Sequence, residues 1–118
     1  MMISLLRLTA SSEKHEAVLR ILQSIVPATL AKPGCLNCGV YEEYDAEHTI
    51  LYSEQWYSEE DLYKHIQSNQ FLRILSAMDF AKDPPQISFH EISNTKHLEL
   101  VENLRYRNDL SSPSEDLI

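Results

Sequence analysis

Apolar residues repeat along the chain with two periods, and the period separates expected strands from expected helices. Continuous or alternating apolar runs, which are typical of strands, occupy residues 2–9, 36–44, 49–57 and 86–92. Apolar residues three and four positions apart, as on one face of a helix, occupy 13–26 and 59–80, with a bend at Asn69-Gln70, and recur within 94–107. The pattern predicts the order β-α-β-β-α-β, followed by an added helix.

Individual residues mark where the expected helices begin and end. Ser11 and Ser12 are N-cap candidates for the first helix. Ser58, with Asp61 three residues later, has the spacing of a capping box for the second. Pro27 has no amide hydrogen, so we expect it to end or kink the first helix.

The order β-α-β-β-α-β is that of the ferredoxin-like fold. This is an α+β arrangement in which a four-stranded antiparallel sheet carries helices on one face. We assign residues 1–93 to this domain, and residues 94–118 to a C-terminal helix and a polar tail.

The expected strand 49–57 carries large side chains on both faces. Tyr52, Glu54 and Trp56 share one face, and Leu51 and Tyr57 lie on the other. Because helices cover one face only, the second face would leave a large apolar patch in water. We therefore expect a homodimer that forms through the sheet face.

Composition and charge exclude several classes of partner. The chain suits one domain, and 43% hydrophobic with 24% charged residues is ordinary for a folded protein. A net charge of −8 argues against nucleic acid and against an anionic membrane surface, since both select clustered Lys and Arg. The first apolar run has no basic region before it, and no run approaches the ~20 residues of a membrane span. We expect a cytoplasmic protein.

Cys35-Leu36-Asn37-Cys38 has the spacing of a redox couple or of half a zinc site. No second C-x-x-C and no nearby pair of histidines accompanies it in the sequence. On one extended strand, Cys35 and Cys38 would also point to opposite faces. We expect two reduced thiols without a metal or redox role.

Four short motifs follow one another in the same order of elements. They are Pro33-Gly34-Cys35, Tyr41, Glu54-Gln55-Trp56-Tyr57-Ser58 and His65-Ile66-Gln67-Ser68-Asn69-Gln70-Phe71. In these motifs and in the order of elements, residues 1–93 resemble the antibiotic biosynthesis monooxygenase (ABM) domain family. The combination carries the resemblance, since each motif alone is short.

The resemblance implies that two subunits pair through their sheets into a dimeric α/β barrel, with a cavity between sheet and helices in each subunit. Relatives include cofactor-independent monooxygenases of aromatic quinols and polyketide-derived phenols, an isomerase of a signalling sugar, and haem-degrading enzymes. We expect a cofactor-independent monooxygenase that oxidises a quinol-like or phenolic aromatic with dioxygen. The alternatives are a non-catalytic ligand-binding or stress-response dimer, and an isomerase of a small metabolite.

The haem-degrading relatives imply an Asn late in the first strand, a Trp on a helix and a His two turns later. Aligned on the Ser68-x-x-Phe71 run, these positions hold Leu6, His65 and Leu75. Leu75 cannot ligate iron, so a haem would depend on His65 alone. We expect no cofactor and no metal.

His65 and Trp56 are the candidate catalytic residues. His65 lies between Leu62 and Ile66 on the inward helical face and matches the histidine of the family motif. Imidazole titrates near neutral pH, so we expect it to act as a base. Trp56 would form an aromatic wall and donate its indole N–H. The structural alternatives are a hydrogen-bonded helix histidine and a core tryptophan.

Tyr52, Glu54 and Arg73 are the candidate substrate-binding residues. Tyr52 stands where the resemblance places a substrate-binding Asn, and its hydroxyl can still donate. Arg73 lies near a position where a relative carries an Arg, which would hold a substrate oxyanion; an Arg on the helix surface is the alternative. Glu54 lies on an apolar face, where a carboxylate must be paired or protonated. A structural bond is the alternative to acid-base work.

Overall fold

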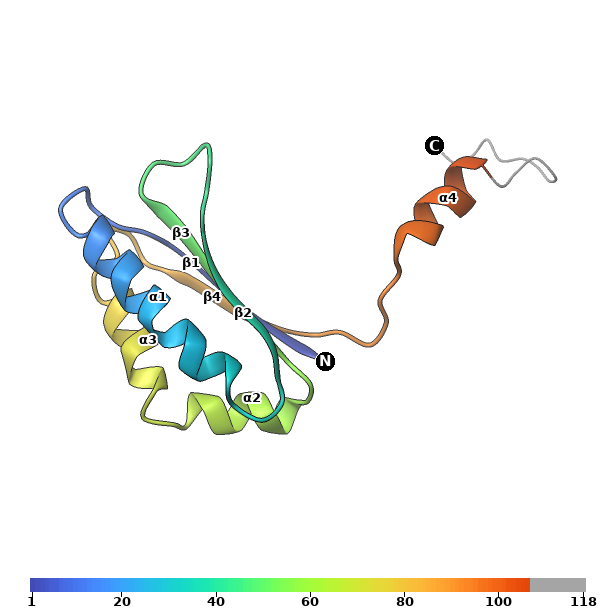
Figure 1. Ribbon diagram of the computed structural model, residues 1–118. Helices are drawn as coiled ribbons and strands as arrows, with labels where there is room; N and C mark the ends of the chain where they lie inside the picture. Colours follow the sequence, from blue (N-terminus) through green and yellow to red (C-terminus); the bar gives the residue numbers. More distant parts are fainter. Residues whose placement is uncertain (107–118) are drawn as a thin grey trace.

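The computed structural model describes residues 1–106, which form a sheet, three helices packed on it and a helix that stands apart (Figure 1). The elements are β1 (Met2–Thr9), α1 (His15–Leu30), β2 (Cys35–Glu42), β3 (Thr49–Trp56), α2 (Glu59–Ile66), α3 (Phe71–Met78), β4 (Gln86–Glu91) and α4 (Leu98–Tyr106).

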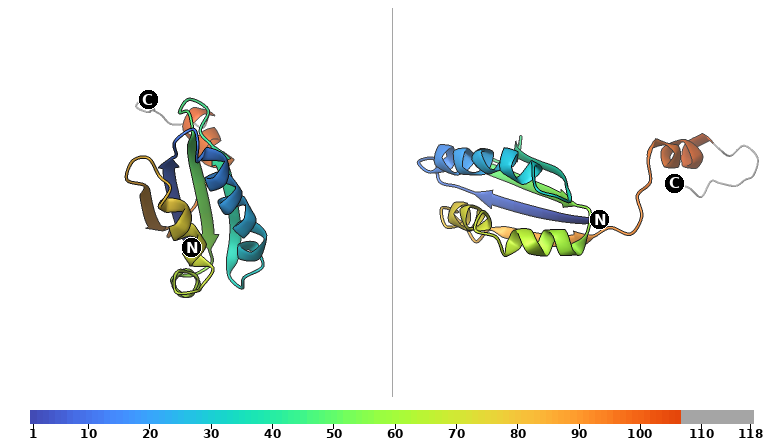
Figure 2. Two further views of the ribbon diagram at one scale, coloured as in Figure 1. Left: turned by 90° about the vertical axis from the view of Figure 1, so that its left-hand side faces the viewer. Right: turned by 60° about the horizontal axis from the view of Figure 1, so that its bottom comes forward.

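The four strands make one antiparallel sheet in the order β2-β3-β1-β4. The chain passes from β1 through α1 to β2 across β3, and from β3 through α2 and α3 to β4 across β1. The helices α1, α2 and α3 all lie on one face of the sheet (Figure 2). This is the split β-α-β topology of the ferredoxin-like fold, and it confirms the predicted α+β class.

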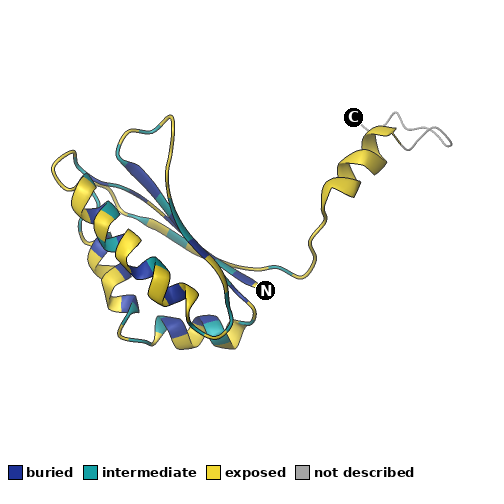
Figure 3. Ribbon diagram, viewed as in Figure 1, coloured by how far each residue is buried: buried dark blue, intermediate teal, exposed yellow. Residues whose placement is uncertain are grey.

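The core fills the space between the sheet and these helices (Figure 3). α1 contributes Val18, Leu22 and Ile25, at the spacing that the sequence predicted. A smaller cluster, in which Met2, Trp56 and Leu62 are buried, lies beneath α2. The sheet-facing side chains are therefore covered along the length of β3.

The N-termini of α1 and α2 are capped in different ways. At α2, the hydroxyl of Ser58 accepts a hydrogen bond from the Asp61 N–H at 3.2 Å, which confirms the predicted cap. α1 begins at His15, and its N-cap residue, Lys14, makes no side-chain capping bond. A turn precedes α1, in which the Ser11 carbonyl accepts the His15 N–H at 2.9 Å, so neither serine is the N-cap.

Pro27 does not end α1, so of the two expected outcomes, an end or a kink, the first was wrong. The helix continues to Leu30, and the Ala31 N–H donates to the Pro27 carbonyl at 3.1 Å. Thr29, in this last turn, is fully buried. Packing of the turn against the sheet therefore outweighs the hydrogen bond that the proline removes.

The inward face of α3 differs from the apolar stripe Phe71, Leu72, Leu75, Met78 and Phe80, which helical spacing predicts within 59–80. Phe71, Ile74 and Ala77 are buried, whereas Leu72 and Leu75 are exposed. The chain breaks its helix between Ile66 and Phe71, and α3 starts with a new rotational phase. The apolar residues alone did not determine that phase, because two neighbouring stripes fit them equally.

A β-bulge places the two cysteines on the same face, contrary to the sequence prediction. Cys35 pairs with Trp56 and Cys38 with Glu54, and the register shifts between Cys35 and Asn37. Directly paired residues share a face, so both thiols lie on the helix side with Trp56 and Glu54. The inserted residue resets the alternation that spacing alone would give.

The helix α4 stands away from the sheet (Figures 1 and 2). It has no buried residue, and the chain between Glu91 and Leu98 has no regular secondary structure. It lies within the predicted range 94–107, whereas the predicted polar tail lies outside the described residues. Within residues 1–106, no helix has the length and apolar character needed to cross a membrane.

The turn between α1 and β2 generates a stability prediction. Gly34 has φ of 85°, and an added Cβ would collide with the Asp61 carboxyl group, which the Ser58 hydroxyl holds in place. We expect Gly34→Ala to lower the free energy of unfolding by about 1–3 kcal/mol, measured by urea denaturation.

Gly39→Ala is the matched control for this prediction. Its added Cβ would meet the hydroxyl end of the exposed Tyr41 ring, which can turn away. We expect a smaller loss than for Gly34→Ala. A loss at Gly34 no larger than that at Gly39 would contradict the role assigned to the turn.

Candidate functional site

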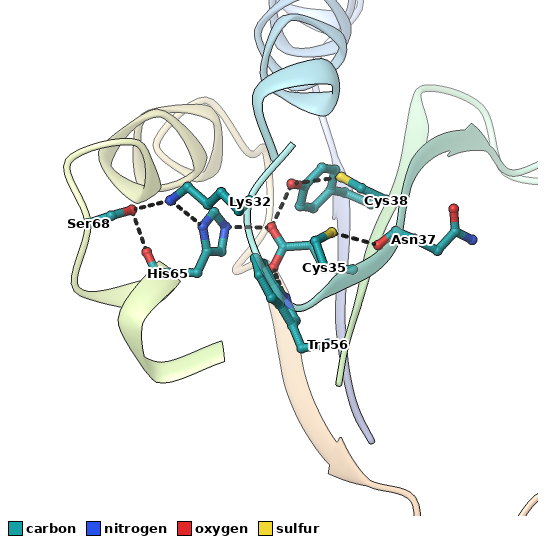
Figure 4. A network of polar contacts seen from close by, with 9 residues as sticks. Lys32, Cys35, Asn37, Cys38, Trp56, His65 and Ser68 are labelled. Carbon is teal, nitrogen blue, oxygen red and sulfur yellow. Dashed lines mark hydrogen bonds and ion pairs between the residues drawn. The ribbon is translucent and has the colours of Figure 1, made fainter. Parts of the chain in front are cut away.

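The buried carboxylate of Glu54 is the centre of a polar network, in which Figure 4 labels Trp56, His65 and Lys32. Its Oε2 accepts hydrogen bonds from the Tyr52 hydroxyl at 2.6 Å and from His65 Nε2 at 2.9 Å. Its Oε1 accepts from the Trp56 indole Nε1 at 3.0 Å. Three donors therefore surround a charge whose side chain has no exposed surface.

The local sequence explains how these groups meet. Tyr52, Glu54 and Trp56 alternate along β3, so all three point toward the helices. His65 comes from α2, where Leu62, one turn earlier, fixes the inward face. The His65 and Trp56 rings lie 4.8 Å apart at their centroids, so they pack as well as share the carboxylate.

The second nitrogen of His65 has a partner from the end of α1. Lys32 Nζ lies 3.0 Å from His65 Nδ1 and 3.0 Å from the Ser68 hydroxyl. An ammonium group can only donate, so Nδ1 accepts and the imidazole proton is on Nε2, toward Glu54. The network thus runs from carboxylate through neutral imidazole to ammonium.

Ser68 belongs to the turn between α2 and α3. Its hydroxyl donates to the His65 carbonyl at 2.6 Å and accepts from Lys32. The break between the two helices therefore supplies an acceptor for the ammonium group.

Burial and hydrogen bonding act on the acidities in this network. Burial alone would raise the pKa of Glu54, but the bonds from His65, Tyr52 and Trp56 outweigh it and keep that pKa below its usual value. Burial, with the nearby Glu54 charge, raises the pKa of Tyr52, so its hydroxyl stays a donor. Burial lowers the pKa of Lys32, which the charge of Glu54 partly opposes.

A pocket of about 290 Å³ borders this network. It lies where the turn after α1 faces α2, and its lining residues are Lys32, Pro33, Trp56, Asp61, Lys64 and His65. The pocket thus combines an aromatic side chain, charged groups and the imidazole. An aromatic wall with a few convergent polar groups is typical of small-molecule sites.

Four of the five predicted site residues come together, and the fifth does not. Tyr52, Glu54, Trp56 and His65 share the network, whereas Arg73 lies on the exposed side of α3. The Arg73 guanidinium donates to the Ser24 hydroxyl at 2.7 Å. This is the surface position that the sequence analysis gave as the alternative for Arg73.

Sequence reasoning missed Lys32 and Ser68. Lys32 lies in a turn, where no periodic pattern assigns a face, and its one signal was the adjacent Pro33-Gly34 pair. In the sequence, Ser68 is a position of the motif from His65 to Phe71, without an assigned role. The structure places Ser68 in the break after α2, where its hydroxyl accepts a hydrogen bond from Lys32.

The two cysteines lie beside the network, and neither thiol forms a hydrogen bond to Glu54 in the described structure. The Cys38 thiol donates to the Tyr52 hydroxyl at 3.3 Å, and burial raises the pKa of Cys38 to about 11. Burial also raises the pKa of Cys35. Both are free thiols. Among residues 1–106, no group of three or more His, Cys, Asp or Glu side chains is placed to hold a metal ion.

An antiparallel ferredoxin-like sheet with a buried Glu-x-Trp pair and a helix histidine beside a pocket is the arrangement that the family comparison can be set against. The model of the antibiotic biosynthesis monooxygenase family matches residues 1–77. The chain belongs to this family.

Known relatives agree on the fold. A provisionally assigned antibiotic biosynthesis monooxygenase from Deinococcus radiodurans is 23% identical, with a TM-score of 0.76 over 83% of this chain and 98% of its own. Rv0793 from Mycobacterium tuberculosis is 18% identical, with a TM-score of 0.73 over 81% of this chain and 98% of its own. At these identities the likeness shows the fold alone.

A relative from Synechocystis, the uncharacterized protein sll1783, is 24% identical over 87 residues. The aligned region is 73% of this chain and 59% of that protein. The chain therefore spans little more than half of this relative.

The pairing of Glu54 generates a second stability prediction. Glu54→Gln introduces N–H donors where Tyr52, Trp56 and His65 already donate, so at least one buried donor loses its acceptor. We expect the free energy of unfolding at neutral pH to fall by about 1–3 kcal/mol. Urea denaturation measures the change, and Glu16→Gln, on the exposed side of α1, is the control.

Acidification provides a third prediction. The folded pKa of Glu54 lies below its ordinary value of 4.5, so its stabilisation is complete above that value and is lost as the pH falls through the folded pKa. We expect the unmodified protein to lose more stability on acidification than Glu54→Gln does. Equal slopes in the two proteins would mean that Glu54 titrates alike in the folded and unfolded chains.

Proposed function

We propose that this protein is a cofactor-independent monooxygenase that oxidises a small quinol-like or phenolic aromatic with dioxygen. The observation that carries the proposal is the Glu54–His65 pair, a buried carboxylate bonded to an imidazole that borders a pocket beside Trp56. Membership of the ABM family supports the reaction class.

The chemistry that we propose depends on the substrate as the source of electrons. A phenol or quinol that loses its hydroxyl proton becomes an electron-rich anion, which can reduce dioxygen directly. The protein then has to supply a base, a group that stabilises the anion and a site with little water. His65 is the proposed base, and Glu54 stabilises the imidazolium that forms.

The pocket suits a small substrate. Its volume of about 290 Å³ is just below the range that is usual for small-molecule sites, roughly 300–1,000 Å³. Trp56 is the aromatic side chain against which a ring can pack. Tyr52 acts through Glu54 in this proposal, since it donates to that carboxylate and is not among the pocket residues.

A specific observation also favours a second candidate, a non-catalytic ligand-binding protein. Both ring nitrogens of His65 already have partners, and its side chain has no exposed surface. A structural histidine would have these properties. A ligand that raises the melting temperature but is recovered unchanged would favour this second function.

Oxygen uptake tests the proposed reaction. Metal-free protein is mixed with a panel of hydroquinones and anthrols, and an oxygen electrode records the rate. We expect uptake with at least one substrate, and His65→Ala to reduce it by about 10²–10⁴-fold, as for loss of a general base. His65→Gln retains a donor toward Glu54 and so separates loss of the base from loss of structure.

Tyr63→Phe is the matched control on the same helix. Its hydroxyl donates only to the exposed Glu59 at 2.8 Å, so we expect unchanged uptake. Uptake by His65→Ala at the rate of the unmodified protein would contradict the assignment of the base. Absence of uptake with the whole panel would contradict the proposed reaction for these substrates.

We also propose that the protein is a homodimer through the free face of its sheet. Ile3, Leu5 and Leu51 are half-buried there, although none of the packed helices covers that face (Figure 2). Burial of these side chains against a second copy would remove apolar surface from water.

Sedimentation velocity tests the dimer. Leu5→Glu places a charge at the centre of the face, and we expect it to give a monomer with a retained circular dichroism spectrum. Leu72→Glu, on the exposed side of α3, is the control and should sediment like the unmodified protein. A dimer that persists in Leu5→Glu would contradict the proposed interface.

A further inference from the structure

We infer that Lys32 is a catalytic residue that binds the substrate as its phenolate anion, and that it exposes the basic nitrogen of His65 when it turns toward the substrate. The inference rests on the proposed function, because it specifies how that site accepts a phenol. It concerns a residue that the motifs of the sequence do not include.

The surroundings of the His65 ring leave one route to it. Nε2 is bonded to Glu54, Trp56 packs 4.8 Å from the ring centre, and Phe71 meets the ring edge-on at 5.7 Å. Nδ1 is bonded to Lys32. Because the side chain has no exposed surface, a substrate reaches Nδ1 only when Lys32 moves.

The position and the flexible side chain of Lys32 allow that movement. It is half-buried, it lines the pocket, and its flexible stem carries three N–H donors. The described contacts of Nζ use two of them, toward His65 and Ser68. An anionic oxygen in the pocket would attract the ammonium group, and the bond to Ser68 can persist while the bond to Nδ1 opens.

The charged groups around Lys32 are of both signs, so an anion in the pocket depends on Lys32 itself. Its Nζ faces the imidazole of His65, the Glu54 carboxylate behind that ring and the Cys35 thiol. Asp61 and Lys64 also line the pocket. The Asp61 carboxylate accepts from the Ser58 hydroxyl at 2.8 Å, and the Lys64 side chain lies 3.7 Å from the exposed Glu60 carboxylate.

The proton step balances without another reactant. The O–H bond of the phenol breaks, its electron pair stays on the oxygen, and the proton forms an N–H bond at Nδ1 of His65. Lys32 then pairs with the phenolate oxygen, and Glu54 pairs with the imidazolium through Nε2–H. The step moves a proton and no electrons, so it precedes the reaction with dioxygen.

A chromogenic phenol tests the inference without turnover. 4-Nitrophenol absorbs in the visible when ionised, so absorbance at a pH near its own pKa reports the ionised fraction of the bound probe. We expect the unmodified protein to lower the pKa of the bound probe by about one unit, a tenfold shift in its ionisation. We expect Lys32→Met to abolish the shift and Lys32→Arg to retain part of it.

Two further variants separate Lys32 from a general effect of charge. Lys14→Met, at the other end of α1, should leave the shift unchanged. If Lys64→Met removes the shift as fully as Lys32→Met does, the charge of the pocket is responsible and the inference is wrong. It is also wrong if the unmodified protein does not ionise the probe, or if folded Lys32→Met ionises it equally.

Nitrogen-detected NMR supplies a readout that a structural role would not change. In the free protein, we expect His65 to carry its proton on Nε2 only, and the bound probe to add a proton at Nδ1. If the complex lacks that added proton, the inference that Lys32 exposes Nδ1 to the substrate is wrong.

Oxygen uptake distinguishes failure of the inference from failure of the proposed function. Uptake by Lys32→Met at the unmodified rate would overturn the inference and leave the proposed monooxygenase standing. If the probe is ionised in a Lys32-dependent way but no quinol supports oxygen uptake, the inference is supported and the proposed monooxygenase reaction is contradicted.

Discussion

A buried negative charge sets the relation between the two layers of this domain. The Glu54 carboxylate has no access to water, and an unpaired charge in such a place costs several kcal/mol. Two of its donors, Tyr52 and Trp56, come from its own strand, and the third, His65, comes from α2. The carboxylate is satisfied only when α2 presents one side to the sheet, so its pairing fixes the rotation of that helix.

Two irregular segments complete the site that this pairing begins. The turn after α1 brings Lys32 to the imidazole, and the break after α2 brings Ser68 to the ammonium group. Loops held by a rigid sheet and helices commonly carry functional groups, because the scaffold holds their ends in place. Here the two loops meet at one nitrogen atom of Lys32. The chemistry available to His65 therefore depends on segments outside its own helix.

The parts of the structure that obey a fixed period were predictable from the sequence. Alternation along β3 placed Tyr52, Glu54 and Trp56 on one face, and helical spacing placed His65 inward beside Leu62. Lys32 was not predictable, because a turn residue has no period and its direction depends on the chain that it faces. The continuation of α1 through Pro27, the phase of α3 and the register of β2 likewise depend on contacts between elements.

The bulge in β2 changes the meaning of position along that strand. Leu36 is the residue skipped in the pairing between Cys35 and Asn37, and its side chain is exposed. If Leu36 instead paired in strict alternation, Cys35 would turn to the uncovered face of the sheet, away from Trp56. Deleting Leu36 would keep Cys35 opposite Trp56 but would remove the bulge, and with it the local bend of the strand just after the turn that carries Lys32. An exposed residue with no partner in the ladder thus decides on which side of the sheet the first cysteine lies.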